Sequence, residues 1–275
     1  MSIKLIVTDM DGTLLNEKMQ ISDRASEAIY RAQQAGLDFA VATGRTADSG
    51  YSMIKEKGLA CAFIELNGAR MFNANEELQF TRAIQQNDAK TIIDIMGNYG
   101  IHNQFYTDNA IYTTNSTEEY IESYAKVFKS INQNLSDGGL MEMMAEYLSE
   151  HNIQTIDSYD FLYKDSNHNL LKAIFNAVDD PSILKVIQKD IESNSENLIV
   201  TSASTHNIEI NHKKANKGQA VSEYAAMRGY KPSEVITIGD NINDFTMLEW
   251  AEHSYAVANA HNNVKKIATY QAPSH

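Results

Sequence analysis

Short apolar runs alternate with amphipathic stretches at the beginning of the chain. Residues 3–8 are apolar and β-branched and end at a polar turn, while residues 22–35 carry apolar positions at helical spacing behind a candidate cap, Ser22. The pattern then repeats, with a strand expected at 37–43, a helix at 46–57 and a strand at 60–66. Strands that alternate with helices of 10–15 residues favour a parallel sheet covered on both faces. The pattern therefore predicts an α/β fold with a doubly wound, Rossmann-like parallel sheet.

The same pattern returns near the C-terminus, but the middle of the chain differs. A helix is expected at 218–228, followed by strands at 235–238 and 255–258. Between about 83 and 211, alternating strands at 104–107, 110–113 and 198–201 mix with helices, one of which opens with a capping box from Ser116 to Glu119. We therefore expect residues 1–82 and 212–275 to form one domain, into which residues 83–211 are inserted as an α+β domain.

Length and composition agree with a folded chain of two domains. The 275 residues are 43% hydrophobic, which excludes general disorder, and the single cysteine, Cys61, cannot form an internal disulfide. That cysteine count fits a reducing compartment. Uninterrupted apolar runs are far shorter than the roughly 18 residues that a membrane span needs, and Asp9 follows Lys4 without the apolar stretch of a leader. We expect a cytoplasmic protein with no membrane partner.

The negative charge is concentrated in the insert. The chain carries a net charge of −13, of which residues 83–211 contribute 19 acidic and 7 basic side chains. Nucleic-acid affinity depends on cationic side chains that displace counterions, so the charge argues against a nucleic-acid partner. Two interpretations of the acidic insert stay open: a solvated surface, or a domain that disfavours highly anionic ligands.

Polar residues follow four strands of the predicted sheet. Because ligands of open α/β sheets bind beyond the carboxyl ends of the strands, we expect these residues to converge on one site. Several carboxylates in one place need a cation, and a set of carboxylate and carbonyl oxygens suits Mg²⁺. The residues are Asp9 and Asp11 after the first strand, Thr43, Gly44 and Arg45 after the second, Asn67 after the third, and Asp240, Asn243 and Asp244 near the C-terminus.

The spacing of Asp9 and Asp11 suits a division of labour between nucleophile and proton carrier. Taken alone, the two could also be a polar turn after a strand. A calcium-binding EF-hand loop fits poorly, since Gln20 stands where the last glutamate should be. One lysine among Lys213, Lys214 and Lys217 could supply the cation that a transferring phosphoryl group needs, although loop lysines are usually only solvated.

Taken together and in this order, the motifs resemble those of the haloacid dehalogenase-like phosphohydrolases, specifically the Cof-type branch with a type II cap. The resemblance covers essentially the whole chain, including the insert. It rests on Asp9-Met-Asp-Gly-Thr-Leu-Leu15, Ala42-Thr-Gly-Arg45, Lys217-Gly218 and Gly239-Asp-Asn-Ile-Asn-Asp244, supported by Asn67-Gly68-Ala69, Glu209 and Ala258-Asn-Ala260.

The resemblance implies a role for each candidate residue. Asp9 would attack phosphorus to give an aspartyl-phosphate, and Asp11 would protonate the leaving group and then activate water. Thr43, Gly44 and Asn67 would bind the phosphoryl group, and Lys217 would neutralise its charge. Asn243 would contact the phosphate or orient Lys217, while Arg45 would contact phosphate or brace the cap or loop. Mg²⁺ would be held by Asp9, the Asp11 carbonyl and Asp240, with Asp244 acting through water or behind the direct ligands.

The expected function is that of a Mg²⁺-dependent phosphatase of small phosphorylated metabolites, with sugar phosphates as the first candidates. Two alternatives stay open: a phosphomutase that returns the phosphoryl group to its substrate, and a non-catalytic protein that binds phosphorylated ligands. The insert corresponds to the cap that supplies substrate contacts in the family. Family members usually continue beyond the position of Ala272 into a last helix, so this helix is expected to be absent or outside the given sequence. No motif residue lies there, and the site should not depend on it.

Overall fold

The computed structural model describes residues 2–131, 138, 148, 152–177, 179–202 and 205–273. The chain divides into two compact units, one formed by Met1–Arg82 with Lys214–His275 and the other by Ala83–Lys213. We call them the first and the second unit. No helix among the described residues is both long enough and apolar enough to cross a membrane.

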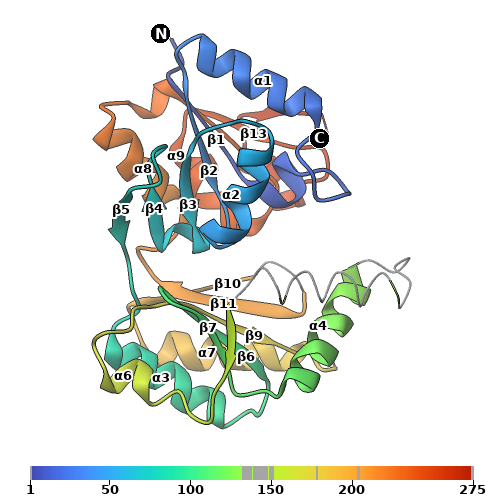
Figure 1. Cartoon of the computed structure of the whole chain (residues 1–275), viewed down its shortest axis with the longest axis vertical. Coiled ribbons are helices and arrows are strands. Elements are labelled where there is room, and N and C mark those ends of the chain that lie inside the picture. Colours follow the sequence, from blue (N-terminus) through green and yellow to red (C-terminus); the bar gives the residue numbers. More distant parts are fainter. Residues whose placement is uncertain are drawn as a thin grey trace. The chain divides into compact units, whose positions relative to one another are not determined.

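The first unit contains an eight-stranded sheet in the order β14-β13-β12-β1-β2-β3-β4-β5 (Figure 1). The pairings from β14 to β3 are all parallel, which confirms the predicted parallel α/β core. These strands are β1 (Leu5–Thr8), β2 (Asp38–Ala42), β3 (Ala62–Glu65), β12 (Val235–Gly239), β13 (His253–Ala256) and β14 (Tyr270–Gln271).

The remaining two strands form an antiparallel hairpin at the edge of the sheet. They are β4 (Arg70–Phe72) and β5 (Leu78–Thr81), and β4 pairs with β3. The sequence pattern did not predict this hairpin. β4 is only three residues long, and an apolar run of that length gives no period from which a strand can be recognised.

Helices cover both faces of this sheet. Alternate residues of β2 take opposite sides: Phe39 and Val41 join one apolar cluster, whereas Ala40 and Ala42 join the other. The first cluster also contains Ile29 of α1, and the second contains residues of α8. Because both faces of the sheet are buried, the sequences of these strands are continuous apolar runs. The helices of the unit are α1 (Asp23–Gln34), α2 (Ala47–Glu56), α8 (Lys217–Met227), α9 (Phe245–Trp250) and α10 (Asn262–Ile267).

The second unit has a six-stranded sheet in the order β10-β11-β9-β6-β7-β8. Its described pairings are antiparallel except that of β7 with β8. Phe105 and Phe175 point to the face that carries the apolar cluster, and Figure 1 shows α3 and α7 beside this sheet. The strands are β6 (His102–Thr107), β7 (Ile111–Thr113), β8 (Ile153–Thr155), β9 (Leu170–Asn176), β10 (Leu198–Thr201) and β11 (Asn207–His212). The helices whose bounds are described are α3 (Gln86–Gly97), α4 (Thr117–Ile131), α6 (Phe161–Lys164) and α7 (Ser182–Asn194).

Two helix starts match the sequence signals that predicted them. Ser22 accepts a hydrogen bond from the backbone N–H of Ala25 at the start of α1. At the start of α4, the N–H of Ser116 donates to Glu119 and the N–H of Glu119 donates to the Ser116 hydroxyl, which is the predicted capping box.

Candidate active site

Four loops and the start of α8 place the predicted site residues at one edge of the first unit's sheet. The loops follow β1, β2, β3 and β12, which are neighbours in the sheet in the order β12-β1-β2-β3. Because these strands are parallel, their carboxyl ends lie at the same edge. Residues that are far apart in the sequence are thereby brought within hydrogen-bond distance.

Lys217 lies at the centre of this site. Its side chain is fully buried, and its Nζ donates to Asp9 Oδ1 and to Asp244 Oδ1, each at 2.6 Å. Burial by itself would lower the pKa of Lys217, but the two carboxylates outweigh it and raise the pKa. Lys213 and Lys214 are exposed. The structure therefore distinguishes Lys217 from its two neighbours, as the sequence could do only by its position before Gly218.

The carboxyl groups of the site are hard to ionise together. Burial raises the pKa of Asp9 well above its ordinary value; Lys217 opposes this effect, while Asp244 and Asp11 add to it. Burial, with a contribution from Asp244, also raises the pKa of Asp240 to about 6. One lysine does not compensate three neighbouring carboxylates, so the site favours a further cation.

The carboxylates are arranged as a divalent-cation site requires. Ligand atoms of Asp9, Asp240 and Asp244 lie within 4.8 Å of one another. Asp240 is held by the Thr13 hydroxyl, which donates to its Oδ1 at 3.1 Å. Carboxylate oxygens are the ligands that Mg²⁺ prefers, so the residues fit this ion.

Asp244 is the least available of the three for direct coordination. Its Oδ1 accepts from Lys217, and its Oδ2 accepts from the backbone N–H groups of Asp240 and Asn241 at 2.8 and 3.0 Å. The side chain thus closes the loop 240–244 on itself and holds the lysine. This geometry suits a residue behind the direct ligands.

Asp11 lies outside the carboxylate cluster and pairs with Arg45. Arg45 Nε and Nη2 donate to the two carboxylate oxygens of Asp11, each at 2.8 Å. Arg45 Nη1 also donates to the hydroxyl of Ser49 at 3.2 Å. Arg45 therefore contacts the loop that carries Asp11, and a contact with phosphate stays a prediction for this residue.

The remaining predicted residues lie around the same edge. Thr43 is fully buried, and its hydroxyl accepts from the N–H of Arg45 at 3.2 Å, across the half-buried Gly44. Asn243 donates through its side chain to Asn67 Oδ1 at 3.2 Å, which links the loop after β12 to the loop after β3. Asn67 has a φ of 60°, a left-handed conformation that asparagine tolerates better than most residues.

Two neighbours of the site were not among the residues predicted to form it. Asn259 donates through its side chain to the carbonyl oxygen of Gly12 at 2.7 Å and so fixes the first loop. Glu65, the last residue of β3, is wholly buried and touches the start of α2. A carboxylate inside the apolar run Ala62-Phe-Ile-Glu-Leu66 was the signal that could have revealed it.

The family model described as haloacid dehalogenase-like hydrolase matches residues 6–275. The chain belongs to this family. The match confirms the resemblance inferred from the motifs.

Relatives that match over nearly the whole chain are named as phosphatases. Phosphatase YwpJ of Bacillus subtilis is 29% identical over 97% of this chain and 93% of its own length. The 5-amino-6-(5-phospho-D-ribitylamino)uracil phosphatase YwtE of the same organism is 28% identical over 99% of this chain and 93% of its own. A solved haloacid dehalogenase-like hydrolase from B. subtilis superposes with a TM-score of 0.88 at 28% identity, covering 99% of this chain and 95% of that one. The protein is a phosphatase of this family.

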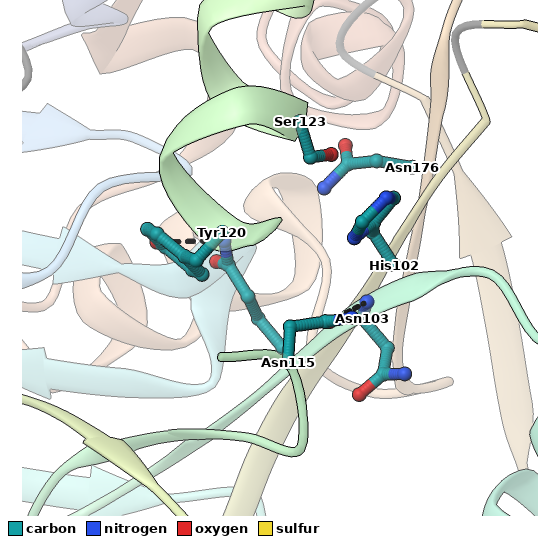
Figure 2. A pocket seen from close by; sticks show the side chains of 7 residues that line it. His102, Asn103, Asn115, Tyr120, Ser123 and Asn176 are labelled. Carbon is teal, nitrogen blue, oxygen red and sulfur yellow. Dashed lines mark hydrogen bonds between the residues drawn. The ribbon is translucent and has the colours of Figure 1, made fainter. Parts of the chain in front are cut away.

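The second unit contains a polar pocket of its own, apart from the predicted site residues. It is lined by His102, Asn103, Gln104, Asn115, Tyr120, Ser123 and Asn176. Figure 2 shows the Ser123 hydroxyl beside the Asn176 amide. The Gln104 amide donates to the Tyr120 hydroxyl at 2.8 Å. The Ser123 hydroxyl and His102 Nδ1 are buried without a hydrogen-bond partner among the described residues. A cavity of about 310 Å³ adjoins them.

Proposed function

We propose that the protein is a Mg²⁺-dependent phosphatase of small phosphorylated metabolites and works through an aspartyl-phosphate. The observation that carries this proposal is the position of Lys217 between Asp9 and Asp244, beside the cluster that Asp240 completes. A buried nucleophile, a fixed cation and a carboxylate cluster on one sheet edge are the elements that phosphoryl transfer needs. Binding alone would require no nucleophile.

Asp9 is the proposed nucleophile. One of its oxygens bonds to phosphorus while the bond from phosphorus to the leaving oxygen breaks, which gives the aspartyl-phosphate and an alcohol. Only the ionised carboxylate can attack. Since burial raises the pKa of Asp9, Lys217 is needed to keep the carboxylate charged. Mg²⁺, held by Asp9, Asp240 and the Asp11 carbonyl, would stabilise the charge on the phosphoryl oxygens.

Asp11 is the proposed proton carrier. It gives a proton to the leaving oxygen in the first step, then takes one from the water that attacks the aspartyl-phosphate, so that phosphate is released and Asp9 is regenerated. Its exposed position next to the buried Asp9 suits this exchange. Arg45 donates to both of its carboxylate oxygens and so limits the positions that it can take.

Thr43, Gly44, Asn67 and Asn243 are proposed to bind the phosphoryl oxygens. Hydroxyl, amide and backbone N–H groups can donate hydrogen bonds to an anion, and the loop after β2 leads into the N-terminus of α2, whose dipole favours negative charge. The same loop carries Arg45. Lys217 would offset the charge that accumulates during transfer.

The second unit is proposed to act as the cap that selects the substrate. Three relatives are named as phosphatases of 5-amino-6-(5-phospho-D-ribitylamino)uracil, a molecule with its phosphate on a polyol chain. Sugar phosphates and phosphorylated polyols are therefore the first candidates. A cytoplasmic location is also part of the proposal, since the lone Cys61 is a free thiol.

Phosphate release from a panel of substrates tests the proposal. The panel contains hexose and pentose phosphates, the phosphoribitylaminouracil, nucleotides, flavin mononucleotide and p-nitrophenyl phosphate, each with Mg²⁺ and with EDTA. We expect Mg²⁺-dependent release from at least one sugar or polyol phosphate and none from Asp9→Asn. A phosphorylated product without free phosphate would favour a mutase, and an Asp9→Asn enzyme of unchanged rate would exclude the covalent route.

A further inference from the structure

Glu65 places a carboxylate in the interior of the first unit. Its exposure is 0%, and it ends β3 at the same sheet edge as the catalytic residues. One oxygen accepts from the backbone N–H of Ala47, and the other pairs with Arg70 Nε. Burial raises the pKa of Glu65, while Arg70 and the Ala47 N–H oppose the shift. Burying an ion pair costs desolvation free energy and rarely stabilises a fold more than apolar packing would. The buried position of Glu65 is therefore not explained by packing alone.

The bond to Ala47 makes Glu65 the cap of α2. Ala47 is the first residue of this helix, and the residue before it, Thr46, makes no side-chain capping hydrogen bond within the described part of the chain. The N-terminus of a helix has unpaired N–H groups and a partial positive charge, both of which a carboxylate satisfies. Here the carboxylate comes from the neighbouring strand. It therefore fixes the helix start relative to the sheet.

The loop that leads into α2 carries two residues of the proposed mechanism, Thr43 and Arg45. Backbone bonds tie this loop to the segment after Glu65: the N–H of Leu66 donates to the Arg45 carbonyl at 3.0 Å, and that of Asn67 to the Thr43 carbonyl at 2.9 Å. With the bond from Ala47 to Glu65, three tethers join residues 43–47 to residues 65–67. Arg45, held in this way, clamps Asp11.

We infer that Glu65, neutralised by Arg70, is a positioning residue that sets the loop of Thr43 and Arg45 and, through Arg45, the proton carrier Asp11. This inference rests on the proposed function, because it concerns the use of Asp11 as the general acid. Glu65 itself touches no substrate. Its loss should weaken the step in which Asp11 gives up a proton more than the binding of the phosphoryl group.

The test compares two substrates that differ in their need for an acid. An alkyl phosphate requires protonation of its leaving oxygen, whereas p-nitrophenolate leaves readily without it. The value compared is kcat/KM, which depends on the steps up to formation of the aspartyl-phosphate and not on the later attack of water, a step that both substrates share. In Glu65→Gln, whose amide can still accept from Ala47 but cannot pair with Arg70 as an ion, we expect kcat/KM for the alkyl phosphate to fall about tenfold, since misplaced catalytic groups cost at least this much. The kcat/KM of p-nitrophenyl phosphate should change by less than about threefold, a range too small to indicate a lost catalytic contact.

Asp38→Asn is the matched control. Asp38 opens β2 at the opposite edge of the sheet and accepts from Arg228 Nε and the Tyr230 hydroxyl, each at 2.8 Å. The substitution removes the ion pair between Asp38 and Arg228, which lies in the same unit but does not touch residues 43–47. The control should lower the melting temperature and leave the ratio of the two substrates' kcat/KM values unchanged.

A second variant covers the case in which Glu65→Gln does not fold. Ala47→Pro removes the N–H that donates to Glu65 and keeps both Glu65 and Arg70, and proline is accepted at the first position of a helix, after an extended residue such as Thr46. It should show the same selective loss on the alkyl phosphate. An equal effect on kcat/KM for both substrates in every variant that folds, or no effect in any of them, overturns the positioning role. Wild-type enzyme that turns over neither substrate would instead refute the proposed function.

Discussion

Gly12 lies directly behind Asp240, in contact with its carboxylate. A Cβ at Gly12 would lie 2.6 Å from Asp240 Oδ2, and the residue has a φ of +77°, in the left-handed region that favours glycine. The loop after β1 and the loop after β12 therefore pack so closely that only glycine fits between them. The close fit fixes one proposed Mg²⁺ ligand through a residue that carries no side chain.

Gly12→Ala should therefore impair catalysis as well as stability. The left-handed conformation costs about 1–2 kcal/mol in any alanine, but the new methyl group must also displace Asp240. Gly36→Ala is the control, since Gly36 has a φ of +86° and a Cβ added there would meet no described atom within 4 Å. Both variants should lose stability in urea, and Gly12→Ala should lose at least as much as Gly36→Ala. Only Gly12→Ala should require more Mg²⁺ for half-maximal phosphatase activity, and equal Mg²⁺ requirements would contradict the proposed contact.

Lys217→Met should be both unstable and inactive. It leaves Asp9 and Asp244 buried without their cation, and removing one partner of a buried ion pair typically costs about 3–5 kcal/mol. Turnover should fall by about 100- to 1000-fold, as when a fixed electrostatic contact is removed. Lys214→Met, at an exposed lysine three residues away, should retain stability and rate. Denaturant unfolding and initial rates measure both effects; an active Lys217→Met enzyme would mean that a neighbouring lysine replaces it.

Cys61 should not react with thiol reagents while the protein is folded. Only 2% of its surface is exposed, and burial raises the pKa of its thiol from 9.0 to about 12, so the reactive thiolate is scarce. Ellman's reagent should modify it only at the rate of unfolding. Fast labelling at about pH 8, near the ordinary thiol pKa, in the absence of denaturant would show that β3 opens easily.

The same thiol should make stability depend on pH in alkaline solution. Because the folded pKa lies above the unfolded value, the unfolded chain loses this proton first, and the thiol's contribution to stability is complete below pH 9 and is lost between pH 9 and about 12. Cys61→Ala lacks this contribution. The free energy of unfolding should therefore decline less steeply in the variant over this range, by up to about 1.4 kcal/mol per pH unit. Parallel curves for the two proteins would contradict the shift.

Ser123→Ala should stabilise the protein. The Ser123 hydroxyl is buried and has no hydrogen-bond partner in the described ranges. An unsatisfied buried polar group costs about 1–3 kcal/mol of stability. Alanine also has a higher helix propensity than serine, which favours α4. We expect the free energy of unfolding to rise by about 1 kcal/mol. Ser49→Ala is the matched control, because Ser49 is equally buried, at 4%, but its hydroxyl accepts from Arg45. Destabilisation by Ser123→Ala would indicate that the hydroxyl is hydrogen-bonded in solution.

The amino-acid sequence alone specifies the elements whose signals are local. The alternation of strands and helices, the cap at Ser22 and the box from Ser116 to Glu119 depend on residues at most a few positions apart. The proposed catalytic motifs belong to this class as well: three of them follow a strand that its own apolar run reveals, and Lys217-Gly218 lies at the start of an expected helix. Together they sufficed to predict the α/β core and the family.

Which of these residues meet depends on the tertiary structure. Lys217 and Asp9 are 208 positions apart, Thr13 and Asp240 are 227 apart, and Arg45 reaches Asp11 over 34. Parallel pairing brings such residues to one sheet edge, but their contacts depend on side-chain directions that no local pattern encodes. The burial of Glu65 beneath α2 is of the same kind. Its carboxylate is stable there only because Arg70 and the helix N-terminus lie on either side, and these neighbours exist only in the folded chain.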